Sequence, residues 1–158
     1  MEGLVFRLMQ KEDEARMRAF YASLGEEGAA FFNLNRGNER RTMDFFGDSP
    51  RKAHEYYVAE VNGTAAGHLF IWDTDTTIPW VGLAVRDDFR RRGVGGFMLV
   101  SLFDLLQARG YGGVLLRTAK ENLPARGLYE KYGFEPLGAH PSGEILYLKR
   151  FTADDKRE

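Results

Sequence analysis

The sequence predicts one mixed α/β domain, and three observations lead to this class. Extended apolar runs alternate with helical patterns along the chain, which favours packed layers of helices and strands. A length of 158 residues is enough for one well-buried core but cramped for two. Hydrophobic residues make up 44% of the chain and charged residues 28%, which argues against disorder. We therefore expect a single domain over residues 1–158.

The N-terminal half is expected to begin with a strand at Leu4–Met9. A helix over 11–24 follows, because apolar residues recur there at helical spacing after an acidic first turn. The pattern from Gly25 to Pro50 is weak and indicates one short helix between loops. Two strand-like runs then flank Asn62-Gly63, the preferred pair for a tight hairpin turn, and another turn is expected at 73–77.

The C-terminal half alternates between extended and helical patterns. Its first helix is predicted from an apolar stripe that ends at a cation and a helix-stopping glycine, and its second from an asparagine and a proline at the start. The expected elements are a strand at Ile78–Val85, a helix from Val94 to Arg109-Gly110, a strand at Gly113–Leu116, a helix from Asn122 to Gly133 and a strand over 144–151.

Composition and charge exclude several function classes. The formal net charge is −1, whereas proteins that bind long nucleic acid usually carry a broad basic excess, so we expect no nucleic-acid partner. The lack of cysteine excludes disulfides and thiol catalysis, and three scattered histidines predict no metal site. No apolar stretch has the length of a signal peptide or a membrane span, so a cytoplasmic protein without a membrane partner is expected.

The stretch RDDFRRRGVGGFML, Arg86–Leu99, places three arginines against a glycine-rich turn at the start of a helix. The first N–H groups of a helix lack intrahelical acceptors and carry positive potential, so this arrangement favours an anion. The glycines leave the backbone open, and the arginines can bind at the rim. Spacing argues against a dinucleotide, because the sixth position from Gly93 is Met98, and the Gly-Lys-Ser/Thr ending of triphosphate loops is absent. A flexible turn with solvated arginines is the alternative.

Two motifs resemble the GNAT superfamily of acetyl-CoA-dependent N-acetyltransferases. LAVRDDFRRRGVGGFML is similar to the acyl-CoA-binding motif Gln/Arg-x-x-Gly-x-Gly/Ala, with Arg90, Gly93 and Gly95 in register. ENLPARGLYEKYGFEPLG is similar to a later family segment, in which Asn122 and Tyr129 fall in place. The likeness covers Ile78–Gly138, which gives an expected acyl-CoA-binding core of about 78–138, whereas the N-terminal half carries no diagnostic motif.

The resemblance implies a mostly antiparallel sheet of about seven strands flanked by about four helices and splayed between the fourth and fifth strands. Acetyl-CoA would lie in the splay, with its pantetheine arm bonded to strand backbone and its pyrophosphate on the glycine turn. Asn122 would touch the pantetheine region, and it equally suits a helix N-cap. The expected cofactor-binding residues are Leu83, Ala84, Val85, Arg90, Arg91, Arg92, Gly93, Val94, Gly95, Gly96 and Asn122.

Tyr129 matches the tyrosine that the family uses to protonate the departing CoA thiolate. A phenol with a pKa near 10 stays protonated at neutral pH, and the thiolate's conjugate acid has a pKa of about 8.5. A core tyrosine is the alternative.

Arg117 stands where some relatives carry a glutamate base. We hypothesise that it attracts a carboxylate or phosphate on the acceptor; a solvent-facing arginine is the other interpretation. The general base stays open among Asp73, Asp75, Glu60 and His68.

The resulting expectation is transfer of an acetyl group from acetyl-CoA to a primary amine by direct attack in a ternary complex, since no activated nucleophile is evident. A non-catalytic acyl-CoA-binding or regulatory module is the alternative. The acceptor, a small molecule or a peptide, would be selected by a segment of about 11–50 and by the loop after Asp73. Phenylalanines 31, 32, 45 and 46 suit a cavity wall or an ordinary core, and the same two alternatives apply to Trp72 and Trp80. A homodimer stays open.

Overall fold

A computed structural model of the chain describes residues 2–25, 38–47 and 53–152. Its strands are β1 (Val5–Leu8), β2 (His54–Val61), β3 (Thr64–Trp72), β4 (Trp80–Val85), β5 (Gly113–Thr118), β6 (Glu135–Ala139) and β7 (Ile145–Arg150). Its described helices are α1 (Glu14–Ser23), α3 (Asn38–Phe45), α4 (Val94–Ala108) and α5 (Leu123–Lys131). Short 3-10 turns precede α1 at Lys11–Asp13 and α4 at Asp87–Phe89. Within the described ranges, no helix is long and apolar enough to cross a membrane.

The seven strands form one sheet in the order β1-β2-β3-β4-β5-β7-β6, and neighbours are antiparallel except for β4 and β5. This confirms the predicted mixed α/β class with a mostly antiparallel sheet. The residue pattern alone did not reveal β6. That strand lies at the sheet edge, is exposed along its length and contains Pro136 and Gly138, so it lacks the apolar alternation of a strand.

The hairpin between β2 and β3 forms at the predicted pair. Asn62 has φ of 50° and Gly63 of 80°, as a tight turn between antiparallel strands requires. The turn makes β2 and β3 neighbours along their whole length, from His54 opposite Trp72 to Val61 opposite Thr64. These strands lie second and third in the sheet, and their side chains contribute to the hydrophobic layers on both faces.

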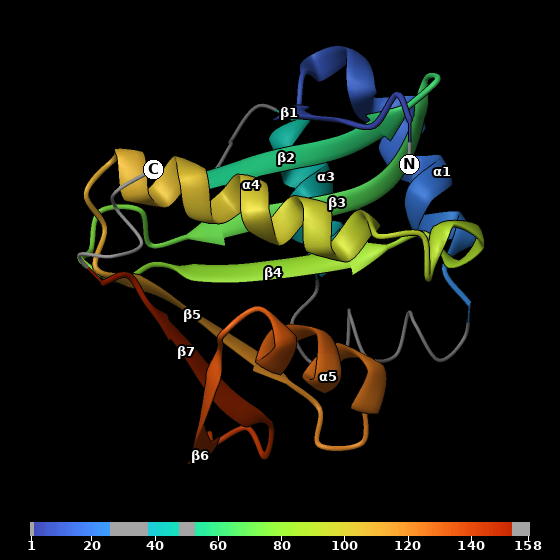
Figure 1. The fold of residues 1–158 in the computed structure, drawn as a ribbon. Coiled ribbons are helices and arrows are strands. Elements are labelled where there is room, and N and C mark those ends of the chain that lie inside the picture. The colour runs from blue at the N-terminus through green and yellow to red at the C-terminus, as the bar shows by residue number, and fades with distance from the viewer. Residues whose placement is uncertain (1, 26–37, 48–52, 153–158) are drawn as a thin grey trace.

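The helices cover both faces of the sheet, with α4 and α5 on one and α1 and α3 on the other (Figure 1). Met98, Leu102 and Leu106 of α4 are fully buried, which confirms the predicted apolar stripe. On the opposite face, Met17 and Phe20 of α1 are fully buried against β2 and β3. The sheet therefore separates two hydrophobic layers, and a ligand that contacts both has to lie between strands.

Strands β4 and β5 separate as the resemblance implied. They are paired at one position, Trp80 opposite Leu115, where the Leu115 N–H donates to the Pro79 carbonyl at 2.9 Å. Beyond that point the two strands diverge, so the sheet opens like a V (Figure 1). We call this opening the split. It leaves one edge of β4 without a strand partner from Leu83 onward.

Candidate active site

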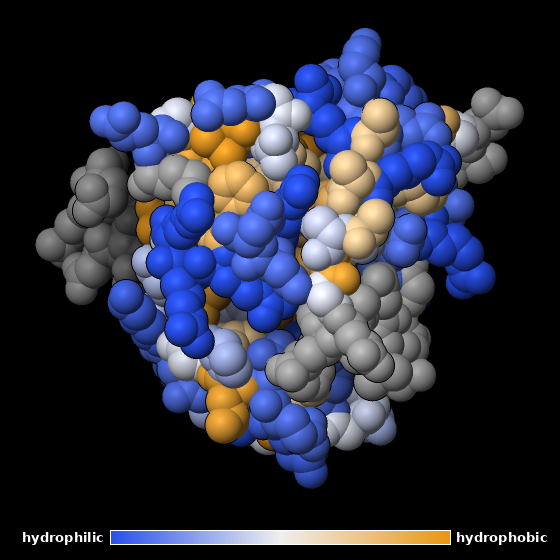
Figure 2. All heavy atoms as spheres, turned by 90° about the vertical axis from the view of Figure 1, so that its right-hand side faces the viewer, coloured by the Kyte–Doolittle hydropathy of each residue, from blue (hydrophilic) through white to orange (hydrophobic). Residues whose placement is uncertain are grey.

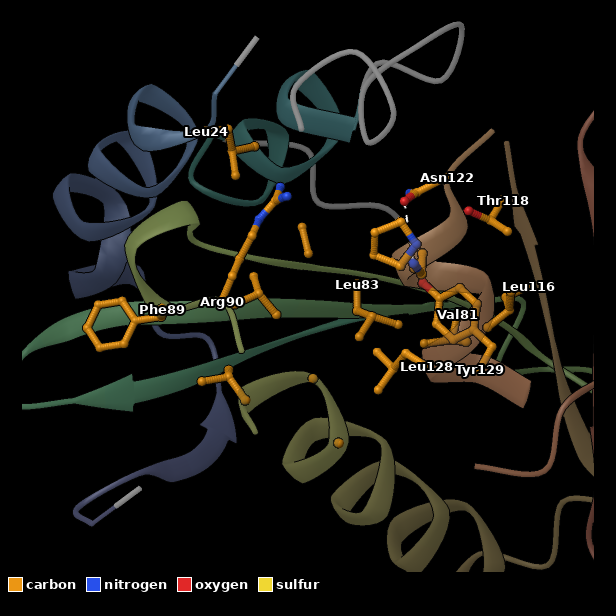
Figure 3. A pocket seen from close by; sticks show the side chains of 18 of the residues that line it. Leu24, Val81, Leu83, Phe89, Arg90, Leu116, Thr118, Asn122, Leu128 and Tyr129 are labelled. Carbon is orange, nitrogen blue, oxygen red and sulfur yellow. Dashed lines mark hydrogen bonds between the residues drawn. The ribbon is translucent and has the colours of Figure 1, made fainter. Parts of the chain in front are cut away.

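A pocket of about 430 Å³ occupies the split. Its walls come from β4, the turn before α4, the start of α4, the end of β5 and the face of α5. Phe89 and Arg90 lie at one end of the pocket, and Leu116 and Tyr129 lie at the other (Figure 3). The pocket is thus lined by residues of both sequence motifs, the glycine-rich turn around Gly93 and the helix that carries Tyr129.

The backbone of β4 alternates between its two neighbours. The Arg86 N–H donates to the Ala66 carbonyl of β3 at 2.8 Å. In an antiparallel pair every second residue makes such bonds, so the peptide groups of Ala84, opposite His68, also point toward β3. The peptide groups of Leu83 and Val85 consequently point toward the split. Leu83, Ala84 and Val85 were expected to offer backbone hydrogen bonds to a ligand. The register leaves those of Leu83 and Val85 free on the edge of β4 that faces the split, whereas those of Ala84 are made with β3.

The turn before α4 presents backbone N–H groups to the pocket. Arg91 has φ of 62° and Gly93, the residue before the first turn of α4, has φ of 83°, so the chain bends sharply into the helix. The Phe97 N–H donates to the Gly93 carbonyl, and this is the first bond of the helix. The N–H groups of residues 94–96 precede it and have no acceptor within the helix. This end of the pocket suits an anion.

Glycine is required at the three positions of this turn for different physical reasons. Gly93 needs its positive φ, and a Cβ there would meet open space. A Cβ on Gly95 would come within 2.9 Å of Leu128, and one on Gly96 would collide with the Tyr132 hydroxyl. The last two glycines therefore let α4 approach α5 closely, in addition to the open backbone that the sequence suggested.

The arginines of the turn divide between the pocket and its surroundings. Arg90 and Arg91 line the pocket, and Arg90 forms an ion pair with Asp87 at 3.1 Å. The guanidinium of Arg92 lies 5.5 Å from the centre of the Phe89 ring and is not among the pocket-lining residues. Hydrophilic residues dominate the surface at the open end of the split (Figure 2).

Asp87 connects this turn to the segment after α1. One carboxylate oxygen accepts a hydrogen bond from the Gly25 backbone N–H at 2.6 Å, while the other pairs with Arg90. Leu24, beside Gly25, lines the pocket, and the Arg90 side chain extends toward it (Figure 3). The end of α1 is thereby held at the mouth of the pocket.

Tyr129 is 7% exposed and lines the pocket at the inner end of the split. Its ring packs edge-on against Phe134, with ring centroids 5.7 Å apart, and against Tyr147 at 6.1 Å. Asn122 also lines the pocket, and its side-chain oxygen accepts a hydrogen bond from the Ala125 N–H, which makes it the N-cap of α5. Both expected residues thus lie at the pocket, and both also stabilise α5.

Arg117 lies between the pocket and the β6–β7 turn. Its Nε is 3.8 Å from a Glu144 carboxylate oxygen, and its Nη1 is 3.2 Å from His140 Nδ1. The guanidinium also lies 5.5 Å from the centre of the Trp80 ring. Arg117 is therefore neither a free cation in the cavity nor a fully solvated side chain. Its role toward the acceptor stays a prediction.

The base candidates lie in three separate places. His68 is fully buried, and burial lowers its pKa to about 4, so its imidazole is neutral near pH 7. Its ring is held between the Tyr57 carbonyl at 2.9 Å and the Thr42 hydroxyl at 3.2 Å, away from the pocket lining. Glu60 is paired with Arg7 on β1.

Asp73 and Asp75 are both exposed in the turn after β3. Asp73 also lines a second hollow together with Arg117.

The phenylalanines that suit a cavity wall or an ordinary core are described only in part. Phe45 and Phe46 pack in the α1–α3 layer as core residues, while 31 and 32 lie outside the described residues. Within the described ranges, no group of three histidine or carboxylate side chains is positioned to hold a metal ion.

Leu24, Asn38 and Thr118 are among the pocket residues that sequence reasoning did not single out. Thr118 follows Arg117 on β5, and strand alternation places the two side chains on opposite faces. A pattern that assigns Arg117 to the cavity therefore does not select Thr118 as well, although both line the pocket. Leu24 and Asn38 come from the α1–α3 layer. Their presence depends on tertiary contacts across the sheet, which the chain pattern does not show.

Comparison with known proteins agrees with this geometry. The profile of the acetyltransferase (GNAT) family matches residues 25–134. A Bacillus subtilis (strain 168) protein with the provisional name ribosomal protein bS18-alanine N-acetyltransferase is 29% identical over 83 residues. That match covers 52% of this chain and 55% of the relative, so it spans about half the length of each.

Solved structures extend the likeness to nearly the whole chain. The GNAT domain of S. lividans PAT has a TM-score of 0.79 at 14% identity, with 94% of this chain and 90% of that chain covered. PaiA N-acetyltransferase from Thermoplasma acidophilum, in complex with coenzyme A, has a TM-score of 0.73 at 12% identity over 94% and 99% of the two chains. AAC(6')-Ib, with ribostamycin and coenzyme A, gives 0.75 at 19% identity over 99% and 98%. These identities establish the fold alone, and together with the family profile they show that the chain belongs to the GNAT acetyltransferase family.

Proposed function

We propose that this chain transfers an acetyl group from acetyl-CoA to a primary amine by direct attack, with both substrates bound at once. The observation that carries the proposal is the composition of the split. One pocket of about 430 Å³ combines an open strand edge, the N-terminus of a fifteen-residue helix and the hydroxyl-bearing side chain of Tyr129. These are the groups that an extended amide-containing thioester with a pyrophosphate requires.

The residues present fit acetyl-CoA. The peptide groups of Leu83 and Val85 are placed to bond the amides of the pantetheine arm as a further strand would. The N–H groups of residues 94–96 suit the pyrophosphate, and Arg90 and Arg91 add positive charge beside it. In this proposal the acyl end lies toward Tyr129, at the opposite end of the pocket.

The chemistry assigns each proton a destination. The neutral amine nitrogen forms a bond to the thioester carbonyl carbon, the C–S bond breaks, and the sulfur leaves as a thiolate. In this proposal Tyr129 gives its phenolic proton to that thiolate, so that coenzyme A departs as a neutral thiol. The proton that the nitrogen loses as the amide forms passes to water, and water returns a proton to the Tyr129 phenolate after the sulfur has been protonated. A free alkylamine has a pKa near 10.4, so it must lose a proton before attack, either to water or to a carboxylate at the cavity.

The side chains available support direct transfer. The chain has no cysteine, and within the described ranges His68 is buried away from the pocket. Nothing among the described pocket residues combines a nucleophile with an adjacent base, as a covalent acyl-enzyme would need. The acetyl group therefore passes to the amine without an intermediate carrier on the protein.

A thiol-release assay with acetyl-CoA and a panel of primary amines tests the proposal. Tyr129→Phe should lower kcat about 100-fold while the KM for acetyl-CoA stays unchanged, because only proton delivery is lost. Tyr57→Phe is a matched control, since the Tyr57 hydroxyl donates to Glu55 at 2.7 Å and Tyr57 is not in the described lining of the pocket. Thiol release by Tyr129→Phe at the wild-type rate would contradict the proposed role. Binding of acetyl-CoA without thiol release from any amine would favour a non-catalytic acyl-CoA-binding module instead.

A further inference from the structure

A second cavity, of about 280 Å³, adjoins the pocket of the split. We call it the aromatic hollow; its described lining residues are Phe70, Trp72, Asp73, Trp80, Val81 and Arg117. Val81 and Arg117 also line the first pocket, so the two cavities meet where β4 and β5 begin to diverge (the labelled Val81 marks this place in Figure 3). Phe70 and Trp72 belong to the layer of α1 and α3, which places the hollow on the sheet face opposite α4.

The walls of the hollow are rigid and apolar. Phe70 and Trp72 stack with ring centroids 4.7 Å apart and an interplanar angle of 24°. Trp80 stands directly opposite Trp72 across the β3–β4 pair. The ring of Phe70 covers Gly82, where a Cβ would collide with it, so Phe70 is locked against β4. Aromatic walls of this kind favour an apolar body, since burial of apolar surface stabilises binding.

The charged residues of the described lining are Arg117 and Asp73, and outside that lining the Arg41 guanidinium lies 4.8 Å from the centre of the Trp72 ring. Arg117 is already balanced, because its Nε is 3.8 Å from Glu144, and both side chains are about one-fifth exposed (21% and 19%). Within the described part of the chain, the Asp73 carboxylate has no ion-pair partner. A carboxylate or phosphate brought into this hollow would meet Asp73 and compete with Glu144 for Arg117. An ammonium group would meet an uncompensated anion.

We propose that the aromatic hollow binds the body of the acceptor and selects a primary amine with a compact apolar or aromatic body and no carboxylate. This inference rests on the proposed acetyltransferase function for its use, but the binding itself does not require turnover. It differs from the hypothesis that Arg117 attracts an acidic acceptor, and the two are distinguished by experiment.

The chain supplies its own reporter of occupancy. Its two tryptophans are Trp72 and Trp80, and both line the hollow. Titration with 2-phenylethylamine should change the tryptophan fluorescence saturably, whether or not acetyl-CoA is present. L-Phenylalanine, which adds only a carboxylate, and ethylamine, which lacks the aromatic body, should each bind at least about tenfold more weakly.

Asp73→Asn tests the charge. Asp73 has φ of 59°, a conformation that asparagine adopts readily, so the variant should fold. Because Asp73 is exposed, its loss should weaken 2-phenylethylamine binding by only about fivefold. Asp75→Asn is the matched control, since Asp75 is exposed in the same turn and is not in the described lining, and it should leave binding unchanged.

The possible outcomes separate the two proposals. Tighter binding of L-phenylalanine than of 2-phenylethylamine would overturn the inference and favour an anion-binding Arg117. Equal binding of ethylamine, or no saturable fluorescence change with 2-phenylethylamine, would also overturn it. Saturable binding that depends on Asp73, without thiol release from acetyl-CoA, would support the hollow as an amine site while the proposed transferase function failed.

Discussion

Protonation of His68 is expected to destabilise the fold as the pH falls. The imidazole is fully buried, and its pKa is lowered to about 4, with desolvation as the main cause. A carbonyl oxygen only accepts hydrogen bonds, so His68 Nδ1–H donates to the Tyr57 carbonyl and Nε2 accepts from the Thr42 hydroxyl. The Tyr21 hydroxyl then donates to Thr42 at 3.0 Å. This chain of bonds ties α1 and α3 to the sheet and requires a neutral imidazole.

The size of the effect follows from the two pKa values. An unfolded histidine has a pKa of about 6.5, so below that pH the unfolded state binds more protons than the folded state. The free energy of unfolding therefore decreases as the pH falls from about 6.5 toward 4, and it is unaffected by His68 well above 6.5. Between pH 7 and pH 5 the expected loss is about 2 kcal/mol from this residue.

Urea unfolding at a series of pH values measures this loss. His68→Gln cannot titrate, so it should be less stable than the wild type at pH 7 but should lack the additional loss between pH 7 and pH 5. The difference between the two proteins removes the contributions of carboxylates and of the other histidines. Equal losses of stability in wild type and variant over this range would refute the buried, neutral assignment of His68.

Three further substitutions test other parts of the structure. Asp13→Asn should lower the free energy of unfolding by about 2 kcal/mol in urea, since the 1%-exposed Asp13 accepts charged hydrogen bonds from two arginines; an unchanged midpoint would contradict this. Gly113→Ala should cost about 2 kcal/mol, because its Cβ would collide with a backbone carbonyl of β7, whereas Gly112→Ala has room and should be near neutral. Tyr147→Phe removes a hydroxyl that donates to Glu130 of α5 at 2.7 Å, and it should lower kcat about fivefold with an unchanged KM for acetyl-CoA. Unaltered kcat would show that this bond does not position α5.

Local chemistry explains why most elements could be predicted from the sequence. The Asn62-Gly63 turn, the Asn122 cap and the glycine after α4 each act within a few residues, so their signals are visible along the chain. The edge strand β6 lacked such a signal, because an exposed strand needs no apolar alternation and this one contains Pro136. Its pairing with β7 follows from the chain connection rather than from composition.

The candidate site was predictable only in part, because its details are nonlocal. The motif identified the residues around Gly93 and Tyr129, and the structure brings them into one pocket. The register that turns Leu83 toward the split depends on pairing with β3, which no local pattern encodes. The ion pair of Arg117 with Glu144 joins residues 27 positions apart, so its neutralising effect is not visible in the local sequence. The sequence offered Trp72 and Trp80 as candidates for a cavity wall, but not their arrangement around one hollow with Asp73 and Arg117.

Hydrogen exchange at the β4 backbone tests most directly whether the split is the acyl-CoA site. In the free protein, the Leu83 and Val85 amides should exchange faster than that of Ala84, which bonds β3. Addition of acetyl-CoA should slow exchange at Leu83, Val85 and the amides of residues 94–96, and leave Ala84 unchanged. Acetyl-CoA that binds without protecting Leu83, Val85 or the start of α4 would contradict the placement of the thioester in the split.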